Sequence, residues 1–534
     1  MCCRWCRHHA ERGTVLVVVA VQLDPRQDWA GQELSAQVRL CFYTGPVTSP
    51  AGQELPKPDY WTGLQELYAR FYAWLLRRLP SERQRLLAVT ILAGGLCGLA
   101  AVAFHLSIMG LEGLLINRAN SAPGNSWIWW TILSPTIGGV VVGAGLTYFA
   151  PAAAGSGIPQ VKVAYALRSG YVTVRETIGK FVLCAIQIGS GASLGLEGPT
   201  VQVCAGVSST LARLARLSPQ NSRRMASVGM AAGIAAAFNA PIAAVTFTLE
   251  ELIGDLDQTM LSGVIVAAAL AAVVEHSVLG SNPIFHVQGN YQLTKSSSLI
   301  WYALLGLLAA IVSVAFTDSL LAVRAWFRML RKVPRWVQPA IGGAATGGMA
   351  VAGLALFHLN GIAGDPYGTL TLALTGKMTV IPLAVFCVLK LAATVCSYSS
   401  GGSGGIFAPS LFMGGMLGGA VGYLDVTVFH HSSDAIGAFA VVGMGAVFAG
   451  IVRAPMTSIL IIFEMTGGYG LVLPLMIANM TAFALARHWR HTPVYEALLA
   501  QDGISLPRGS GPYDSGDDEP VPGIPGAKSQ CEPA

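Results

Sequence analysis

The chain contains few charged residues for its length, and this scarcity excludes an ordinary soluble protein. Asp, Glu, Lys and Arg make up 11% of its 534 residues, whereas soluble domains carry about 25%. The net charge of +5 is too small to indicate a nucleic-acid partner. The sequence also lacks the H-E-x-x-H and G-x-x-x-x-G-K-[ST] patterns, which removes two large groups of enzymes from consideration.

Metal-binding patterns are equally scarce. Cys3 and Cys6 form a C-x-x-C pair with His8 and His9 nearby, but no second set of paired ligands accompanies them. We therefore interpret these residues as part of a loose tail, and we predict neither a metal nor a cofactor.

The sequence is instead rich in long apolar runs, since 53% of its residues are hydrophobic. Runs of about 18 or more apolar residues indicate membrane-spanning helices. Segments of that length or slightly shorter recur, and we predict an all-α polytopic membrane protein. The runs are Leu86–Ile116, Trp127–Phe149, Met260–Val274, Leu299–Phe316, Ile341–Phe357, Met378–Val395 and Ile436–Ile451.

The predicted helices differ widely in length. Leu86–Ile116 would form a helix of roughly 46 Å, longer than the hydrocarbon core of about 30 Å, and should be strongly tilted. The segment Ile158–Arg168 would reach only about 16 Å and cannot span the bilayer. Long tilted helices mixed with short broken ones are typical of a transporter or channel.

Composition divides the chain into three regions. Residues 1–60 are more polar and are predicted to be an N-terminal extension that is disordered or cytoplasmic. Residues 61–503 should form the transmembrane domain, with halves at roughly 86–280 and 299–490. Residues 504–534 are rich in Pro, Gly, Ser and Asp and are predicted to be a disordered tail.

Arginines predict the orientation of the chain. Arg77, Arg78, Arg83 and Arg85 precede the first apolar run. By the positive-inside rule they place the N-terminus in the cytoplasm. We expect the C-terminus on the same side.

The two halves contain related sequences. "VGMAAGIAAAFNAPIAAVTFTLEE" begins at Val228, and "VGMGAVFAGIVRAPMTSILIIFEM" begins at Val442, so that Glu250 and Glu464 occupy corresponding positions. Upstream, "GLEGP" likewise corresponds to "GIFAP". Two related halves in one membrane chain are typical of transporter folds built from repeats. The interval between them has room for an odd number of crossings, which would invert the second copy.

Three glycine-rich stretches interrupt the apolar sequence at Gly155–Gln160, Gly195–Pro199 and Gly401–Pro409. Each contains proline and precedes a helix-compatible run, which predicts a helix N-terminus at membrane depth. A helix N-terminus presents free N–H donors and a partial positive charge. Several such ends aimed at one point would bind an anion.

Glu197 lies inside the second of these stretches. A carboxylate in such apolar surroundings is expensive, so an ionisable residue there indicates function. At the mouth of an anion site, an ionised Glu197 would compete with the anion, and a protonated Glu197 would leave.

Taken together, "GSGIP", "GLEGP" and "GGIFAP" resemble the three anion-site motifs of the CLC family of chloride channels and chloride/proton exchangers. The similarity extends from about residue 65 to 503. It implies an inverted-repeat fold with tilted and broken helices, in a multi-pass protein of the cell (inner or plasma) membrane. It also implies a homodimer with one pore per subunit.

The resemblance further implies a set of chloride ligands. Ser156, between Gly155 and Gly157, and Tyr495 in "HTPVYEALL" would contact chloride through their hydroxyls. The backbone N–H groups of Ile406 and Phe407 would bind the same ion. Ser156 together with Tyr495 implies chloride rather than nitrate or fluoride.

Other residues would handle protons and charge. Glu197 matches the gating glutamate, which carries both gate and proton, and Lys180 matches a buried lysine that adds positive potential. Glu251, the second acid of "FTLEEL", falls at the inward-facing proton position of the exchangers. Glu250 is duplicated as Glu464 and is interpreted as structural, whereas Glu251 has no repeat partner.

These residues favour exchange of chloride for protons, and two alternatives remain. A passive chloride channel, gated by voltage or pH, would share the anion site, and Glu251 argues against it. An intramembrane serine hydrolase would use Ser403 of Gly401–Gly405, which satisfies G-x-S-x-G. No histidine lies in a supporting pattern, so we predict that the chain is not an enzyme. The chain also lacks the paired cytoplasmic nucleotide-binding domains of many eukaryotic members.

Overall fold

The computed structural model describes residues 81–120, 122–253, 258–280, 285, 298–430 and 434–506. All of them belong to one compact unit of the chain, Leu75–Ala534. The expectations for residues 1–60, including Cys3 to His9, and for 507–534 concern residues outside this description.

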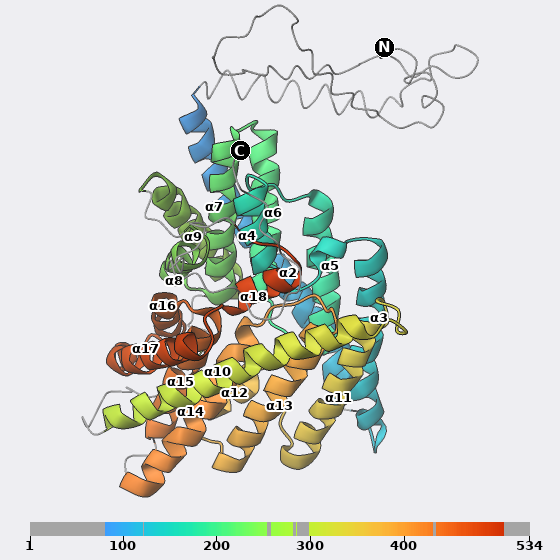
Figure 1. Ribbon diagram of the computed structural model, residues 1–534, viewed down its shortest axis with the longest axis vertical. Helices are drawn as coiled ribbons and strands as arrows, with labels where there is room; N and C mark the ends of the chain where they lie inside the picture. Colours follow the sequence, from blue (N-terminus) through green and yellow to red (C-terminus); the bar gives the residue numbers. More distant parts are fainter. Residues whose placement is uncertain are drawn as a thin grey trace, which may run out of the picture. The chain divides into compact units, whose positions relative to one another are not determined.

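The first half consists of helices joined by short connections, coloured blue to green in Figure 1. They are α2 (Glu82–Asn120), α3 (Ser126–Tyr148), η2 (Pro151–Ala153), α4 (Ile158–Leu167), α5 (Val174–Gly189), α6 (Glu197–Leu214), α7 (Pro219–Phe238), α8 (Pro241–Thr248), the π-helical turn η3 (Leu249–Ile253) and α9 (Gln258–Leu279).

The second half repeats this order and is coloured yellow-green to red. Its elements are α10 (Ser298–Met329), α11 (Gln338–Phe357), α12 (Tyr367–Leu374), α13 (Val380–Ser399), α14 (Phe407–Phe429), α15 (Asp434–Val452), α16 (Pro455–Thr466), η4 (Tyr469–Leu471), α17 (Val472–Trp489) and α18 (Val494–Gln501). The short α18 lies between the two groups of helices, where it contacts α4, α10 and α15 (Figure 1).

The predicted apolar runs all lie on helices, to within two residues at their ends, so the membrane class is confirmed. Within the described ranges, nine segments are long and apolar enough to cross a membrane. The largest difference concerns α10, predicted to end near Phe316 but continuing to Met329. Thr317, Asp318 and Ser319 interrupt the apolar run without ending the helix, because none of them is Gly or Pro and each costs little helix propensity. The membrane-length helices α14 and α17 were not among the predicted runs.

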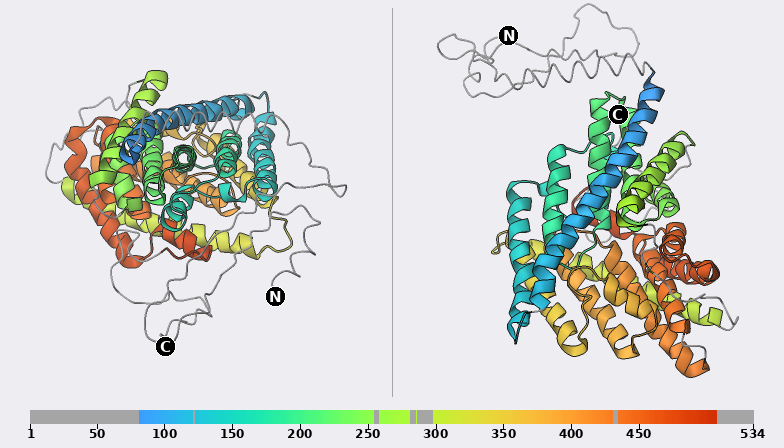
Figure 2. Two further views of the ribbon diagram at one scale, coloured as in Figure 1. Left: turned by 90° about the horizontal axis from the view of Figure 1, so that it is seen from above. Right: turned by 180° about the vertical axis from the view of Figure 1, so that it is seen from behind.

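The longest helix, α2, has 39 residues and runs diagonally across its neighbours (Figure 2, right). It packs against α3, α5, α6, α7 and α9. A slanted helix contacts more neighbours than an upright one. The long helix that was predicted from Leu86–Ile116 is thus present as α2.

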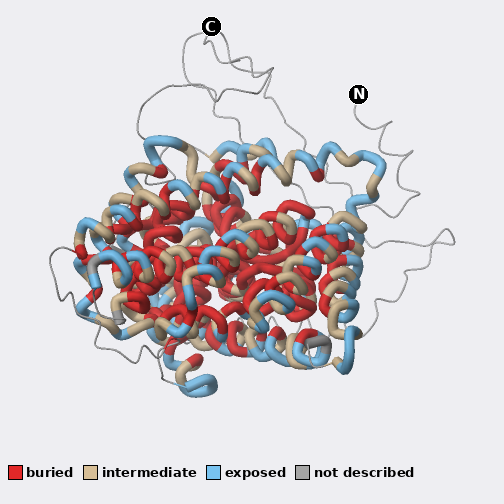
Figure 3. Tube along the Cα trace, turned by 90° about the horizontal axis from the view of Figure 1, so that it is seen from below, coloured by how far each residue is buried: buried red, intermediate tan, exposed pale blue. Residues whose placement is uncertain are grey.

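The interior is mostly apolar. Buried residues concentrate inside the bundle, and exposed residues lie along its outside (Figure 3). α15 is almost wholly buried between α10, α14 and α17. It packs closely on α14, and glycine permits this approach. A Cβ added to Gly414 would lie only 2.2 Å from the Gly443 carbonyl oxygen. Small residues that bring two helix backbones together are typical of membrane interfaces.

The two halves are joined by a reciprocal contact. Glu464 on α16 accepts a hydrogen bond from the backbone N–H of Ala243 at the start of α8, at 2.8 Å. Glu250, which follows α8, accepts one from the N–H of Thr457 at the start of α16, also at 2.8 Å. Each carboxylate caps the partner helix, where free N–H groups and the dipole favour an anion. Such a mutual contact is the pattern of a two-fold axis relating the halves.

Candidate anion site

The three glycine-rich stretches meet in the centre of the protein. Gly155 N donates to the Gly402 carbonyl at 3.0 Å, and Gly404 N donates to the Gly155 carbonyl at 3.1 Å. Gly195 and Gly405 exchange two backbone hydrogen bonds of 2.7 Å. These bonds satisfy the irregular backbone inside the protein, as a membrane interior requires. They also bring the starts of α4, α6 and α14 to one place.

Glycine is required where α4 and α6 begin. Gly157 has φ +103°, and a Cβ there would lie 2.4 Å from the Gly198 carbonyl oxygen. A Cβ on Gly198 would lie 2.4 Å from the Ser156 carbonyl oxygen. The two first turns therefore touch through their backbones.

Two buried hydroxyls face this region without a protein partner. Ser156 and Tyr495 are both 0% exposed. Neither hydroxyl oxygen has a hydrogen-bond partner among the residues that the structure describes. Buried polar groups are almost always hydrogen-bonded, so these two hydroxyls are available to donate to a ligand that enters the site.

The start of α14 supplies backbone donors. Ile406 precedes the first residue of the helix, Phe407, and both are fully buried. The first N–H groups of a helix have no partner within it. The Phe407 ring is fixed against Phe247 and Phe448, with centroids 5.3 and 4.8 Å away. Side-chain packing thus holds the backbone donors in position.

Glu197 occupies the centre of this arrangement and is 0% exposed. Its Oε1 accepts a hydrogen bond from the Tyr367 hydroxyl at 3.0 Å. Its Oε2 lies 3.4 Å from the N–H of Ala408, in the first turn of α14. The carboxylate also lies over Gly195, where a Cβ would come within 2.3 Å of Oε2. In this structure the carboxylate itself uses a donor of the kind that an anion would use.

Two buried lysines lie near the site, one in each half. Lys180 donates to the carbonyls of Ala153 and Gly155, at 3.0 and 2.5 Å. Lys390 donates to the carbonyls of Gly361 and Ile362, at 2.9 and 3.1 Å. Each ammonium group stabilises the loop before a short helix, α4 or α12, and adds positive potential to the interior.

The second lysine was missed in the sequence analysis although a signal existed. Its number exceeds that of Lys180 by 210 (390 − 180), the same offset as between Pro199 and Pro409 (409 − 199). Extending the repeat alignment upstream of the glycine-rich stretches would have found it. No comparable signal pointed to Tyr367.

Glu251 lies in the π-helical turn after α8 and is 3% exposed. It is therefore buried, unlike a solvated acid at a helix end. Its Oε1 accepts a hydrogen bond from Lys162 Nζ at 2.8 Å. The same ammonium group pairs with Glu496. Neither Lys162 nor Glu496 was predicted from the sequence, although Lys162 directly follows "GSGIPQV" and Glu496 follows Tyr495.

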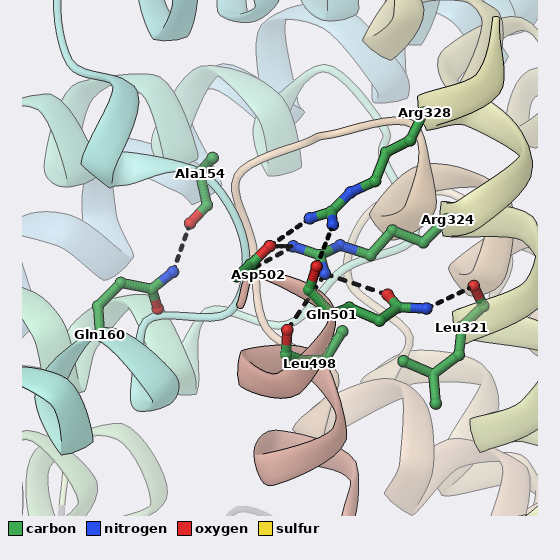
Figure 4. A network of polar contacts seen from close by, with 8 residues as sticks. All are labelled: Ala154, Gln160, Leu321, Arg324, Arg328, Leu498, Gln501 and Asp502. Atoms are coloured by element: carbon green, nitrogen blue, oxygen red, sulfur yellow. Dashed lines mark hydrogen bonds and ion pairs between the residues drawn. The ribbon is translucent and has the colours of Figure 1, made fainter. Parts of the chain in front are cut away.

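The helix that carries Tyr495 is anchored at its far end (Figure 4). Asp502 accepts hydrogen bonds of 3.0 and 3.1 Å from Arg324 on α10, and it also pairs with Arg328. Arg324 donates to the Leu498 carbonyl at 3.3 Å as well. These contacts fix α18 on α10 and hence fix the position of Tyr495.

Ser403, the alternative nucleophile, is buried and donates its hydroxyl hydrogen to the Ala153 carbonyl at 2.7 Å. A nucleophilic serine is activated by a base that accepts this hydrogen. Here the hydroxyl instead ties the loop before α14 to the loop before α4, which is a structural role.

The fold and site together define a polytopic membrane transport protein, in which two repeated halves bring helix N-termini, two free hydroxyls and one carboxylate to a common buried point. The family model described as "Voltage gated chloride channel" matches residues 138–487, and the chain belongs to this family. The fold is thus the inverted-repeat CLC-type fold with tilted and broken helices.

Known relatives support the same family membership. The chain is 31% identical over 439 residues to a protein named H(+)/Cl(-) exchange transporter ClcA from Salmonella arizonae, covering 80% of this chain and 91% of the relative. Among solved structures, it is similar to a slow cyanobacterial Cl-/H+ antiporter, with a TM-score of 0.72 and 25% identity, covering 78% of this chain and 98% of the other. A eukaryotic CLC transporter shares the fold, with a TM-score of 0.65 and 22% identity, covering 78% of this chain and 74% of the other. These relatives are named as transporters and not as enzymes.

Proposed function

We propose that this protein exchanges chloride for protons across the membrane. The observation that carries the proposal is the buried Glu197 among the starts of α4, α6 and α14, next to the unpaired hydroxyls of Ser156 and Tyr495. The names of the relatives, which are exchange transporters, support the same activity.

Chloride would bind between Ser156 and Tyr495. Their hydroxyls would donate to it, together with the backbone N–H groups of Ile406 and Phe407. Gly155 and Gly157 allow the backbone to approach the ion closely. Helix N-termini suit an anion because they offer donors and partial positive charge without a counter-ion that would hold it too tightly.

Glu197 would serve as gate and proton carrier. When ionised, it competes with chloride for the donors of α14. When protonated, it loses the charge that those donors favour and leaves them to chloride. One carboxyl group that excludes chloride and accepts a proton couples the opposed movement of both ions.

Glu251 would pass protons between Glu197 and the cytoplasmic solution. Its burial beside Lys162 supports a specific role, because burying a carboxylate costs free energy that a residue with no function would not justify. Lys180 would add positive potential to the anion site.

A passive chloride channel is the second candidate, favoured by the description of the family. Liposomes containing the purified protein, with a chloride gradient and a pH electrode outside, distinguish the two. Exchange predicts uphill proton movement that reverses when the chloride gradient is reversed. Chloride flux without proton movement would instead identify a channel and overturn the proposal.

For assembly, we propose a homodimer with one pore per subunit. Ile242 and Met456, at the starts of α8 and α16, are 55% and 59% exposed beside the reciprocal caps, and such an apolar surface suits a second copy. Light scattering in detergent should give about twice the protomer mass.

We also propose that both termini are cytoplasmic in the inner or plasma membrane. Arg83 and Arg85 at the start of α2 support this orientation by the positive-inside rule. The division into 1–60, 61–503 and 504–534 remains a prediction. Epitopes added at either end should be inaccessible from outside intact cells.

A further inference from the structure

A row of three charged side chains leads from the interior to the surface. Glu251, Lys162 and Glu496 come from three elements, η3, α4 and α18. Lys162 Nζ lies 2.8 Å from Glu251 Oε1 and pairs with Glu496 on its other side. The side chains are 4%, 3% and 33% exposed in the order Glu251, Lys162, Glu496. The row is therefore closed to solvent at Glu251 and open at Glu496.

The charges in this row do not balance. Two ionised carboxylates share one ammonium group, which leaves one negative charge in excess. The neighbouring Glu250 does not offset this charge, because it is itself an acid. Its carboxylate accepts hydrogen bonds from backbone N–H groups at the start of α16. Uncompensated charge is costly inside a protein, so the row favours the uptake of one proton.

Glu496 has a free position for such a proton. Its Oε1 contacts Lys162, whereas its Oε2 is buried without a hydrogen-bond partner among the described residues. A carboxylate oxygen has lone pairs that require donors. An unpaired buried oxygen on a partly exposed residue is suited to hold a proton that enters from the solvent side.

The row is also attached to the anion site. Lys162 lies on α4, which begins just after Ser156, and Glu496 follows Tyr495 on α18. The pair thus connects the two helices that carry the free hydroxyls. Lys162 and Glu496 could therefore serve only to hold Tyr495 in place. An experiment must distinguish this structural role from proton transfer.

We propose that Glu496 is the solvent-side proton station for Glu251 and that Lys162 connects the two carboxyl groups. This rests on the proposed exchange function. A proton from the solution protonates Glu496. Lys162 gives one ammonium proton to the Glu251 carboxylate and takes the Glu496 proton in return. Lys162 ends as ammonium and Glu496 as carboxylate, so the net result is the transfer of one proton to Glu251.

The test uses the full-length protein in liposomes, with chloride and proton fluxes recorded together and chloride binding measured by calorimetry in detergent. In Glu496→Gln we expect the proton flux to fall at least about tenfold, because a general acid–base group is lost. Chloride flux and chloride affinity should stay near those of the unchanged protein. Glu496→Asp, which keeps the carboxyl group, should restore most of the proton flux.

Glu176→Gln is the matched control. Glu176 is another partly exposed carboxylate, which accepts a hydrogen bond from the Thr173 N–H at the start of α5 and pairs with Arg168, just after α4. It should leave both fluxes unchanged. Lys162→Met should lower the proton flux like Glu496→Gln, because it separates the two carboxyl groups.

Three outcomes would overturn the proposal. An unchanged ratio of protons to chloride in Glu496→Gln would exclude a proton station. A parallel loss of chloride affinity and both fluxes would show that the pair only positions Tyr495. Chloride flux without proton flux in the unchanged protein would refute the exchange function itself. This result can be told apart from the other two because it appears before any substitution is made.

Discussion

The hydroxyl of Tyr367 donates a hydrogen bond to Oε1 of Glu197 at 3.0 Å. Tyr367 is the first residue of α12 in the second half, whereas Glu197 is the first residue of α6 in the first half. A residue from the other repeat thus holds the Glu197 carboxylate in its position at the centre of the site.

Removing this donor should make the site easier for chloride to enter. Hydrogen bonds to charged groups contribute about 1.5–3 kcal/mol. In Tyr367→Phe, we expect chloride to compete better with Glu197, so that the apparent chloride affinity rises by about tenfold, the equivalent of roughly 1.4 kcal/mol. Calorimetric titration with chloride measures this change, and an unaltered affinity would show that the bond does not hold the gate.

Substitution of Glu197 itself tests whether one carboxyl group serves both ions. Glu197→Ala should pass chloride without any proton movement, since the competing anion and the proton carrier are lost together. Parallel recordings of chloride and pH in liposomes provide the measurement. A Glu197→Ala protein that still pumped protons would refute the mechanism.

Glu251→Gln should separate the two ions differently. Proton movement should fall to background, while chloride still crosses through the intact anion site. Lys162 keeps its contact with Glu496, so the fold should be preserved, and size-exclusion chromatography checks this. Coupled transport at the original ratio would contradict the role proposed for Glu251.

Gly157→Ala should destabilise the protein. Its φ of +103° and the 2.4 Å approach of a Cβ to the Gly198 carbonyl oxygen require both backbone strain and displacement. A strained residue of this kind costs about 1–3 kcal/mol, before the clash is added. Thermal unfolding in detergent should show a lower midpoint. Gly110→Ala on α2, where a Cβ meets nothing within 4 Å, is the control and should not lower it.

The reciprocal caps offer a test of the repeat. Loss of a helix cap costs about 0.5–2 kcal/mol. We expect Glu464→Ala and Glu250→Ala to lower the unfolding midpoint by similar amounts, because each removes the equivalent contact at α8 or α16. A large effect on proton coupling from either one would contradict their structural role.

Much of the fold was predictable because the membrane imposes a simple rule on sequence. Apolar runs must be helices where water cannot satisfy the backbone, so segments such as Leu86–Ile116 could be assigned with their approximate ends. The repeat and the glycine-rich stretches likewise indicated helix starts at membrane depth. The end of α10 was misjudged because a few polar residues interrupt hydropathy more than they interrupt a helix.

By itself, the amino-acid sequence determined that this is a helical membrane protein of two related halves, with Glu197 placed among helix starts suited to an anion. Composition, periodicity and glycine spacing are local properties, and they suffice for those conclusions. Only the tertiary structure decided that Tyr367 holds Glu197 and that Lys162 joins Glu251 to Glu496. These contacts join residues far apart in the chain, and their existence depends on how the helices cross, which no local pattern encodes.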